Sequence, residues 1–111
     1  MSNNQPNPST HNANLPLAFV AKMVAKPGQE TALGDFLAGA LPLANDEPGT
    51  AVWFAAQTAP DTYWIFDAFG SEEDRDAHAN GAIVAALGEN AERLLAVAPE
   101  IMPADVLAAK V

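Results

Sequence analysis

Apolar residues gather in four short runs that are typical of β-strands. The runs cover residues 17–25, 50–57, 62–69 and 101–109. Side chains at successive positions of a strand project to opposite faces of the sheet. In the first run, Phe19 and Met23 fall on one face, while Val20 and Val24 fall on the other. The pattern therefore predicts four strands that carry apolar side chains on both faces.

A helix is predicted between the first two strands. Lys26-Pro27-Gly28 ends the first strand, and Glu30 follows in the first helical turn, where a carboxylate suits the positive end of the helix dipole. The apolar residues beyond it recur at helical spacing and form one stripe: Leu33, Phe36, Leu37, Ala40 and Leu41. Because Pro42 lacks an amide hydrogen and clashes with the preceding turn, we expect a kink or an end near Leu41.

A second helical region is predicted after the third strand. Ser71 can cap it by accepting an amide hydrogen bond three residues on, and the acids that follow sit at the positive end of the helix. Asn80-Gly81 should interrupt this region. A second stripe then runs to Pro99, formed by Ile83, Leu87, Ala91 and Leu94.

The order of elements predicts the fold class. Thr58-Ala59-Pro60-Asp61 has the length and chemistry of a hairpin loop, so the two aromatic-rich strands on either side of it should pair antiparallel. Strand, helix, strand, strand, helix, strand is the ferredoxin-like βαββαβ order. We therefore expect an α+β domain with a four-stranded antiparallel sheet and both helices on one face.

Two helices cannot cover both faces of such a sheet. A sheet that is half exposed in a monomer normally alternates apolar with polar side chains, and these strands do not. An uncovered apolar patch usually marks an interface, and twofold pairing is the commonest way to close one. The sequence thus predicts a homodimer formed through the sheet face.

Composition bounds the remaining possibilities. Residues 1–14 are rich in Asn, Pro and Ser and are predicted to be a polar tail, in which His11 is expected to be solvated; residues 15–111 should form one domain. Fourteen acidic and five basic side chains give a net charge of -9, which disfavours nucleic acid and anionic membranes as partners. There is no cysteine, and we find no signal or spanning segment, so a cytoplasmic protein is expected.

Three short motifs give the chain a family resemblance. They are the Lys26-Pro27-Gly28 turn, the Glu47-Pro48-Gly49 turn before the second strand, and the third strand 65–69 followed by Ser71 and Ala77-His78. In these motifs the sequence resembles the antibiotic biosynthesis monooxygenase family, a branch of the dimeric α+β barrel superfamily that includes quinol monooxygenases and haem-degrading monooxygenases. The resemblance covers residues 17–109. Family members usually carry Glu where this chain has Asp67.

The resemblance implies oxygenation without metal or flavin. Members of this kind take a small aromatic or quinol-type substrate, form its electron-rich anion and let that anion react with dioxygen. The haem-degrading branch has a histidine one or two turns beyond the Ala-His pair, where this chain has Ala85-Ala86-Leu87. We therefore expect no haem, no metal and no other cofactor.

His78 and Asp67 are the candidate catalytic residues. The ordinary pKa of histidine suits proton transfer, although His78 could equally be a helix-surface residue without chemistry. Asp67 is an acid within an apolar strand, and a buried carboxylate needs a partner. It could make a polar contact that sets the register of a dimer, or it could orient His78. The second interpretation fails if the two side chains lie on opposite faces of the sheet.

The aromatic residues of the hairpin are candidates for a substrate-binding wall. Trp53, Tyr63, Trp64 and Phe66 are assigned to it, although such clusters are more often core or interface. The leading hypothesis is a cofactor-independent monooxygenase that uses dioxygen and a small aromatic substrate. The alternatives are a non-enzymatic ligand-binding or stress-related dimer of the same fold, and an isomerase or aldolase acting on a small polar metabolite. The scarcity of Lys and Arg makes the last less attractive for a phosphorylated substrate.

Overall fold

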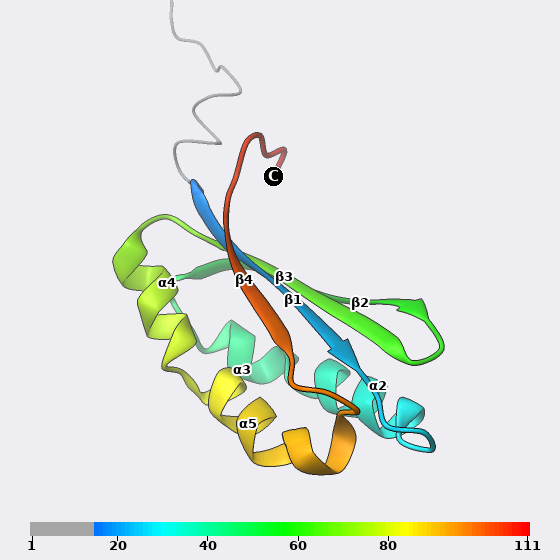
Figure 1. Cartoon of the computed structure of the whole chain (residues 1–111). Coiled ribbons are helices and arrows are strands. Elements are labelled where there is room, and N and C mark those ends of the chain that lie inside the picture. The colour runs from blue at the N-terminus through cyan, green and yellow to red at the C-terminus, as the bar shows by residue number, and fades with distance from the viewer. Residues whose placement is uncertain (1–14) are drawn as a thin grey trace, which may run out of the picture.

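The computed structural model describes residues 15–111, so the predicted tail at 1–14, with His11, lies outside the described residues. Figure 1 shows one layer of strands with the helices packed beneath it. The elements in chain order are β1 (Leu17–Val24), α2 (Glu30–Ala38), α3 (Leu41–Asn45), β2 (Thr50–Ala59), β3 (Thr62–Phe69), α4 (Glu72–Ala79), α5 (Ala82–Leu94) and β4 (Glu100–Asp105).

The four strands form one antiparallel sheet in the order β2-β3-β1-β4. The two crossovers, each carrying a pair of short helices, lie on the same side of it (Figure 1). This is the ferredoxin-like arrangement, and the predicted α+β fold class is confirmed. Pro103 lies in β4, an edge strand, where a missing amide hydrogen is tolerated.

Both predicted helix interruptions are confirmed. The first helix ends at Ala38, earlier than Leu41, and α3 begins at Leu41 with Pro42 in its first turn, where proline needs no intrahelical partner. Leu41 was expected in the buried stripe but is 47% exposed, because the break rotates it away from the core. The second region divides into α4 and α5 around Asn80-Gly81, and the Ser71 Oγ accepts the Asp74 amide at 3.1 Å as a cap.

The core lies between the sheet and the helices. Its main cluster joins β1 and β3 to α2 and α5, with Met23, Leu33 and Leu94 wholly buried. Burying such side chains contributes about 1.5–3 kcal/mol each, which makes this layer the main source of stability. Among the described residues, no helix is both long and apolar enough to cross a membrane.

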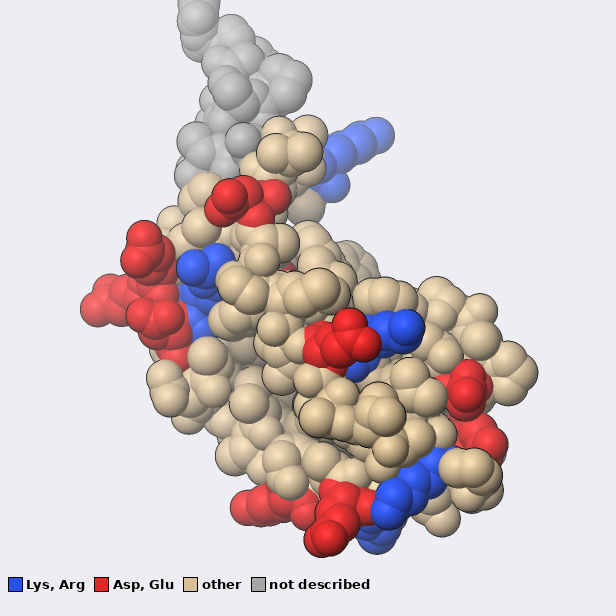
Figure 2. Space-filling view, in the orientation of Figure 1, with Lys and Arg blue, Asp and Glu red and all other residues tan. Residues whose placement is uncertain are grey.

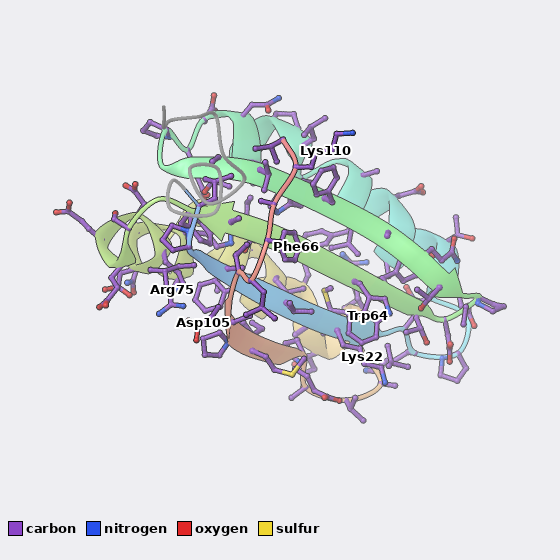
Figure 3. All side chains as sticks on the ribbon, turned by 90° about the horizontal axis from the view of Figure 1, so that it is seen from above. Lys22, Trp64, Phe66, Arg75, Asp105 and Lys110 are labelled. Atoms are coloured by element: carbon purple, nitrogen blue, oxygen red, sulfur yellow. The ribbon has the colours of Figure 1, made fainter. Side chains whose placement is uncertain are left out.

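The opposite face of the sheet is apolar and only partly covered. Phe54 is 61% exposed and Phe66 39% exposed, and both project from the face away from the helices. Figure 3 looks down on this face, with Phe66, Trp64 and Lys22 on it. The chain beyond β4 crosses above the sheet toward β2 and ends near Lys110 (Figure 3). A hollow of about 210 Å³ remains under this segment, beside Phe54 and Phe66.

The last strand is shorter than expected. A strand over residues 101–109 was predicted, but β4 runs only from Glu100 to Asp105. Asp105 pairs with Leu17, the first residue of β1, and one further bond runs from the Val106 amide to the Pro16 carbonyl at 2.9 Å. Because Pro16 has no amide hydrogen to return, the ladder ends there. Residues beyond this point follow the open face instead (Figure 3).

Candidate functional site

His78 occupies the last turn of α4 and is 5% exposed. The helix begins at the Ser71 cap and stops at Asn80, so its C-terminal turn is set against the sheet. Position 78 therefore faces the sheet while the acidic side chains of the first turn remain outside. Figure 2 shows a cluster of acidic side chains over α4.

Two carboxylates hold the His78 ring from opposite sides. Asp67, in the middle of β3, places its Oδ2 3.0 Å from His78 Nε2. Glu47, in the turn before β2, places its Oε1 2.7 Å from His78 Nδ1. Thr50 adds a further bond, because its hydroxyl donates to the same Glu47 oxygen at 2.7 Å. Asp67 and His78 thus lie on the same side of the sheet. The interpretation that Asp67 orients His78 required this placement.

The two contacts determine the protonation of the ring. A carboxylate only accepts hydrogen bonds, so both ring nitrogens must carry hydrogen for both contacts to form. Burial by itself lowers the pKa of His78, but the hydrogen bonds to Asp67 and Glu47, together with their charges, raise the pKa of His78 above its ordinary 6.5. The C-terminal end of α4 favours a cation as well. The two contacts therefore favour the imidazolium form of His78.

Aromatic rings enclose the imidazolium. The ring centre of Phe69 lies 5.3 Å from that of His78, and the ring centre of Phe19 lies 6.2 Å away. Arg75 lies over the Phe19 ring at 5.5 Å. Phe69 is fully buried, so this shell keeps water from the charged group and strengthens its ion pairs.

An apolar cavity of about 260 Å³ lies beside Asp67 and His78. It opens between the sheet and the pair α4 and α5. Apart from the two polar groups, its lining is apolar and comes from β1, β3, β4 and both helices: Phe19, Ala21, Ile65, Ala79, Ile83, Val84, Leu87 and Ile101. In the described part of the chain, the cavity thus combines an apolar wall with one charged pair.

Three buried polar atoms near this site have no hydrogen-bond partner within residues 15–111. They are Asp67 Oδ1, Glu47 Oε2 and Trp53 Nε1. Asp67 and Trp53 are neighbours across β3 and β2 and project to the same face. A buried polar atom without a partner costs about 1–3 kcal/mol, so unpaired acceptors on both acids are unfavourable for stability alone. Such atoms are suited to receive a ligand or water.

Glu47 was missed as a site residue by the sequence analysis. It was noted only as part of the Glu47-Pro48-Gly49 turn, and nothing in its spacing links it to a histidine 31 positions later. A nearby glycine makes room for it. A Cβ at Gly81 would lie 2.8 Å from Glu47 Oε2, so a side chain at this position would displace the Glu47 carboxylate.

The predicted aromatic wall is divided between the two faces. Trp53 and Tyr63 lie on the helix side, Trp53 beside Asp67 in the sheet and Tyr63 farther along, where its hydroxyl donates to the Glu30 carbonyl at 2.9 Å. Trp64 and Phe66 lie on the open face. None of the four lines the cavity beside His78. Its aromatic wall is Phe19 instead.

A larger hollow of about 440 Å³ lies between α2 and β2, open to solvent. Its side chains include Asp35, Gln57 and Tyr63, and the Tyr63 hydroxyl already bonds to Gln57 at 3.1 Å. Within residues 15–111, no group of three or more His, Cys, Asp or Glu side chains is placed to hold a metal ion. The chemistry is therefore concentrated at His78.

Solved structures share this fold. A protein of unknown function from Nitrosomonas europaea, NE2512, is 52% identical over 89% of this chain and 96% of its own, with a TM-score of 0.87. A candidate antibiotic biosynthesis monooxygenase from Chloroflexus aurantiacus is 26% identical over 86% and 96%, with a TM-score of 0.67. Another from Nitrosomonas europaea is 16% identical over 82% and 98%, with a TM-score of 0.73. No protein-family model and no curated protein sequence matches the chain.

The chain thus has the α+β fold that these candidate antibiotic biosynthesis monooxygenases share. The chain belongs to the same family as NE2512. The family resemblance predicted from its turns and from the Ala77-His78 pair is confirmed at the level of the fold.

Proposed function

We propose that the protein is a cofactor-independent monooxygenase of a small aromatic, quinol-type substrate. One observation carries the proposal: a buried carboxylate, Asp67, bonds to His78 through one oxygen and leaves the other without a partner, at the wall of an apolar cavity. An acceptor in a water-poor pocket is what removal of a phenolic proton requires. The names of the two neighbours described as candidate antibiotic biosynthesis monooxygenases, from Chloroflexus aurantiacus and Nitrosomonas europaea, support the same reaction class.

The structure suggests a division of roles between the two predicted catalytic residues. Both ring nitrogens of His78 are already occupied by carboxylates, so the ring has no free lone pair with which to take a proton. Asp67 has an oxygen free to do so. We therefore assign proton removal to Asp67, while His78 fixes its orientation and balances its charge.

The size of the cavity and the charges beside it limit the class of substrate. An apolar cavity of about 150 Å³ holds benzene, so about 260 Å³ suits one or two fused rings rather than an extended polycycle. The site contains one cationic ring and two carboxylates, and it therefore repels an anion. It should bind a neutral phenol that donates its hydroxyl hydrogen to Asp67, and it should reject aromatic carboxylates.

The proposed reaction needs no external reductant. Loss of the phenolic proton gives an anion whose ring carbon reacts with dioxygen. One oxygen atom becomes a ring carbonyl, and the other leaves as water with the two hydrogens lost by the phenol. The four electrons taken up by dioxygen come from the substrate ring, three from the carbon that is oxygenated and one from the hydroxyl-bearing carbon, which also becomes a carbonyl. The protein supplies an apolar site, an orienting acceptor and the exclusion of water.

We also propose that the open sheet face joins two copies of the chain. Phe54 and Phe66 leave an apolar patch that an isolated domain would expose to water. Trp64 lies beside them on the same face, with Lys22 over its ring at 5.7 Å. In this arrangement, Trp64 and Phe66 serve the dimer and the helix side of the sheet serves catalysis.

Oxygen uptake by the purified chain with one-ring and two-ring quinols tests the proposal. We expect uptake without added cofactor, reduced about 10²–10⁴-fold by Asp67→Asn, which keeps the shape and removes the base. His78→Ala should also abolish turnover. As a control, Asp35→Asn changes an acid in the hollow between α2 and β2 and should leave turnover unchanged.

Tight binding of these ligands without any oxygen uptake would instead support the non-enzymatic, ligand-binding alternative. That outcome remains compatible with the apolar cavity, which suits an aromatic ring with or without chemistry. Equal turnover by the wild type and Asp67→Asn would refute the assignment of the base.

A further inference from the structure

His78 lies between two cavities. On one side is the inner cavity beside Asp67, of about 260 Å³. On the other is an outer cavity of about 360 Å³, lined by the turn before β2 and by the junction of α4 and α5. Glu47 and His78 both line the outer cavity, together with polar groups that include Asp46, Thr50 and Asp74.

A continuous series of polar atoms joins the two spaces. It runs from Asp67 Oδ1, which has no partner, through Oδ2 to His78 Nε2 at 3.0 Å. From His78 Nδ1 it continues to Glu47 Oε1 at 2.7 Å. The second Glu47 oxygen again has no partner, and the Glu47 side chain is 19% exposed, against 2% for that of Asp67. The series is thus buried at its inner end and reaches the surface at its outer end.

We propose that Asp67, His78 and Glu47 form a proton relay, in which Asp67 takes up a proton in the inner cavity and His78 in turn gives one up through Glu47 to the outer cavity. The inference rests on the proposed function, since that reaction supplies the proton. Glu47 becomes a functional residue, although it never touches the substrate. Its role is to receive the proton that His78 passes on.

The proton balance closes without a further reagent. The substrate hydroxyl gives its proton to Asp67. Once neutral, Asp67 no longer stabilises the charge of His78, so His78 Nδ1 gives its proton to Glu47 while Nε2 keeps its own. Glu47 releases the proton to solvent in the outer cavity. When water forms from dioxygen, Asp67 returns its proton to it, and His78 takes a proton back through Glu47. The transfer from His78 to Glu47 runs along a hydrogen bond of 2.7 Å, and none of the three side chains gains or loses electrons.

The surroundings give the proton no other way out. Every other residue that lines the inner cavity is apolar, so none can carry a proton. On the outer side, Asp74 on α4 and Asp46 before β2 add negative charge that draws a proton outward. Arg75, also on α4, lies over the Phe19 ring and lines neither cavity.

Chemical rescue tests the relay. Glu47→Ala removes the last acceptor and leaves a gap in a cavity where formate has room, beside Gly49 and Gly81. We expect turnover to fall at least about tenfold and to recover with added formate in a saturable way. Glu89→Ala, an exposed acid on α5, should show neither the loss nor the rescue. Glu47→Gln should lose turnover but resist rescue, because its side chain fills the gap.

A second measurement does not depend on oxygenation. Binding of 4-nitrophenol without oxygen can be followed through the colour of its anion, and proton release through a pH indicator. In the wild type, anion formation and proton release should be simultaneous, whereas in Glu47→Ala the release should lag at least about tenfold until formate is added.

The outcomes separate the two proposals. Undiminished turnover in Glu47→Ala, or a loss that formate does not repair, overturns the relay and leaves the monooxygenase intact. Absence of oxygen uptake by the wild type overturns the monooxygenase, and the nitrophenol experiment then decides the relay alone. If the wild type neither binds nor ionises 4-nitrophenol, both proposals fail.

Discussion

The two faces of the sheet depart from the usual distribution of side chains in opposite ways. On the helix-covered face, Asp67 and His78 are buried among apolar residues and form an ion triad with the half-buried Glu47. On the open face, Phe54 and Phe66 remain exposed to water. Neither arrangement favours the stability of an isolated chain, because buried charges cost desolvation and exposed rings lose burial. The comparison teaches that both faces depart from what stability alone favours, the covered face at a charged site and the open face at an apolar surface.

The largest expected effect comes from substitutions that disrupt the open face and weaken the proposed dimer. A double substitution, Phe54→Asp with Phe66→Asp, puts two charges into the proposed interface. We expect the dissociation constant of the dimer to rise about 10²–10³-fold or more, as for the loss of central hot-spot residues. Sedimentation velocity at micromolar concentration measures it.

The control for this change is Ala85→Asp on the exposed side of α5, which adds a charge away from both faces. It should leave the assembly unchanged. A wild-type chain that sediments as a monomer at micromolar concentration would contradict the dimer before any variant is made.

The next largest effect is expected from a substitution at Gly81, beside the site on the helix-covered face. Gly81→Ala would bring a Cβ to 2.8 Å from Glu47 Oε2 and push Glu47 away from His78. We expect a loss of about 1–3 kcal/mol in the free energy of unfolding, because an ion pair and a close contact are both disturbed. Chemical denaturation measures this loss, and the NMR titration of His78 should show a lower pKa than in the wild type.

Gly88→Ala is the matched control, since nothing lies within 4 Å of a Cβ at this position inside α5. It should stabilise the protein by about 0.5–1 kcal/mol through the better helix propensity of alanine. If both variants behave alike, Gly81 does not serve the contact between Glu47 and His78.

A smaller effect concerns the inner cavity. Val84, half-buried on α5, forms part of its wall. Val84→Phe should place a ring in the space proposed for the substrate. KM for a two-ring quinol should then rise about tenfold, with less effect on a one-ring quinol. Steady-state oxygen uptake measures this ratio. Ala85→Phe, one position along on the exposed side, should not alter it.

The smallest effect is the pH dependence of stability. The pKa of His78 is raised in the folded state, so its contribution is complete below the unfolded value near 6.5 and is lost as pH rises through the higher folded pKa. The groups that face His78 are Asp67 from β3, Glu47 before β2, and Asp74 and Arg75 on α4.

We expect the melting temperature to fall by a few degrees over this range in the wild type and by less in Glu47→Gln, where the pKa is raised less. Scanning calorimetry from about pH 6 to about pH 9 measures the difference. Parallel curves for the two proteins would show that Glu47 does not contribute to the pKa of His78.

The sequence by itself determined the elements, their order and the breaks between them. Period-two and helical patterns, Pro42, the Ser71 cap and Asn80-Gly81 act over a few residues, so local rules suffice to read them. The apolar content of both strand faces also predicted an uncovered sheet surface, which the structure shows at Phe54 and Phe66. His78 and Asp67 could be named because acids and histidines stand out in apolar segments.

Only the tertiary structure decided which residues share the site. Glu47, Asp67 and His78 come from a turn, a strand and a helix, and no local pattern records that these meet within 3.0 Å. The division of the aromatic residues between the faces likewise depends on which face the helices cover. The sequence of the hairpin does not determine this. The cavity and its Phe19 wall exist only after β1, β3, β4, α4 and α5 have come together, because packing over long sequence separations creates them.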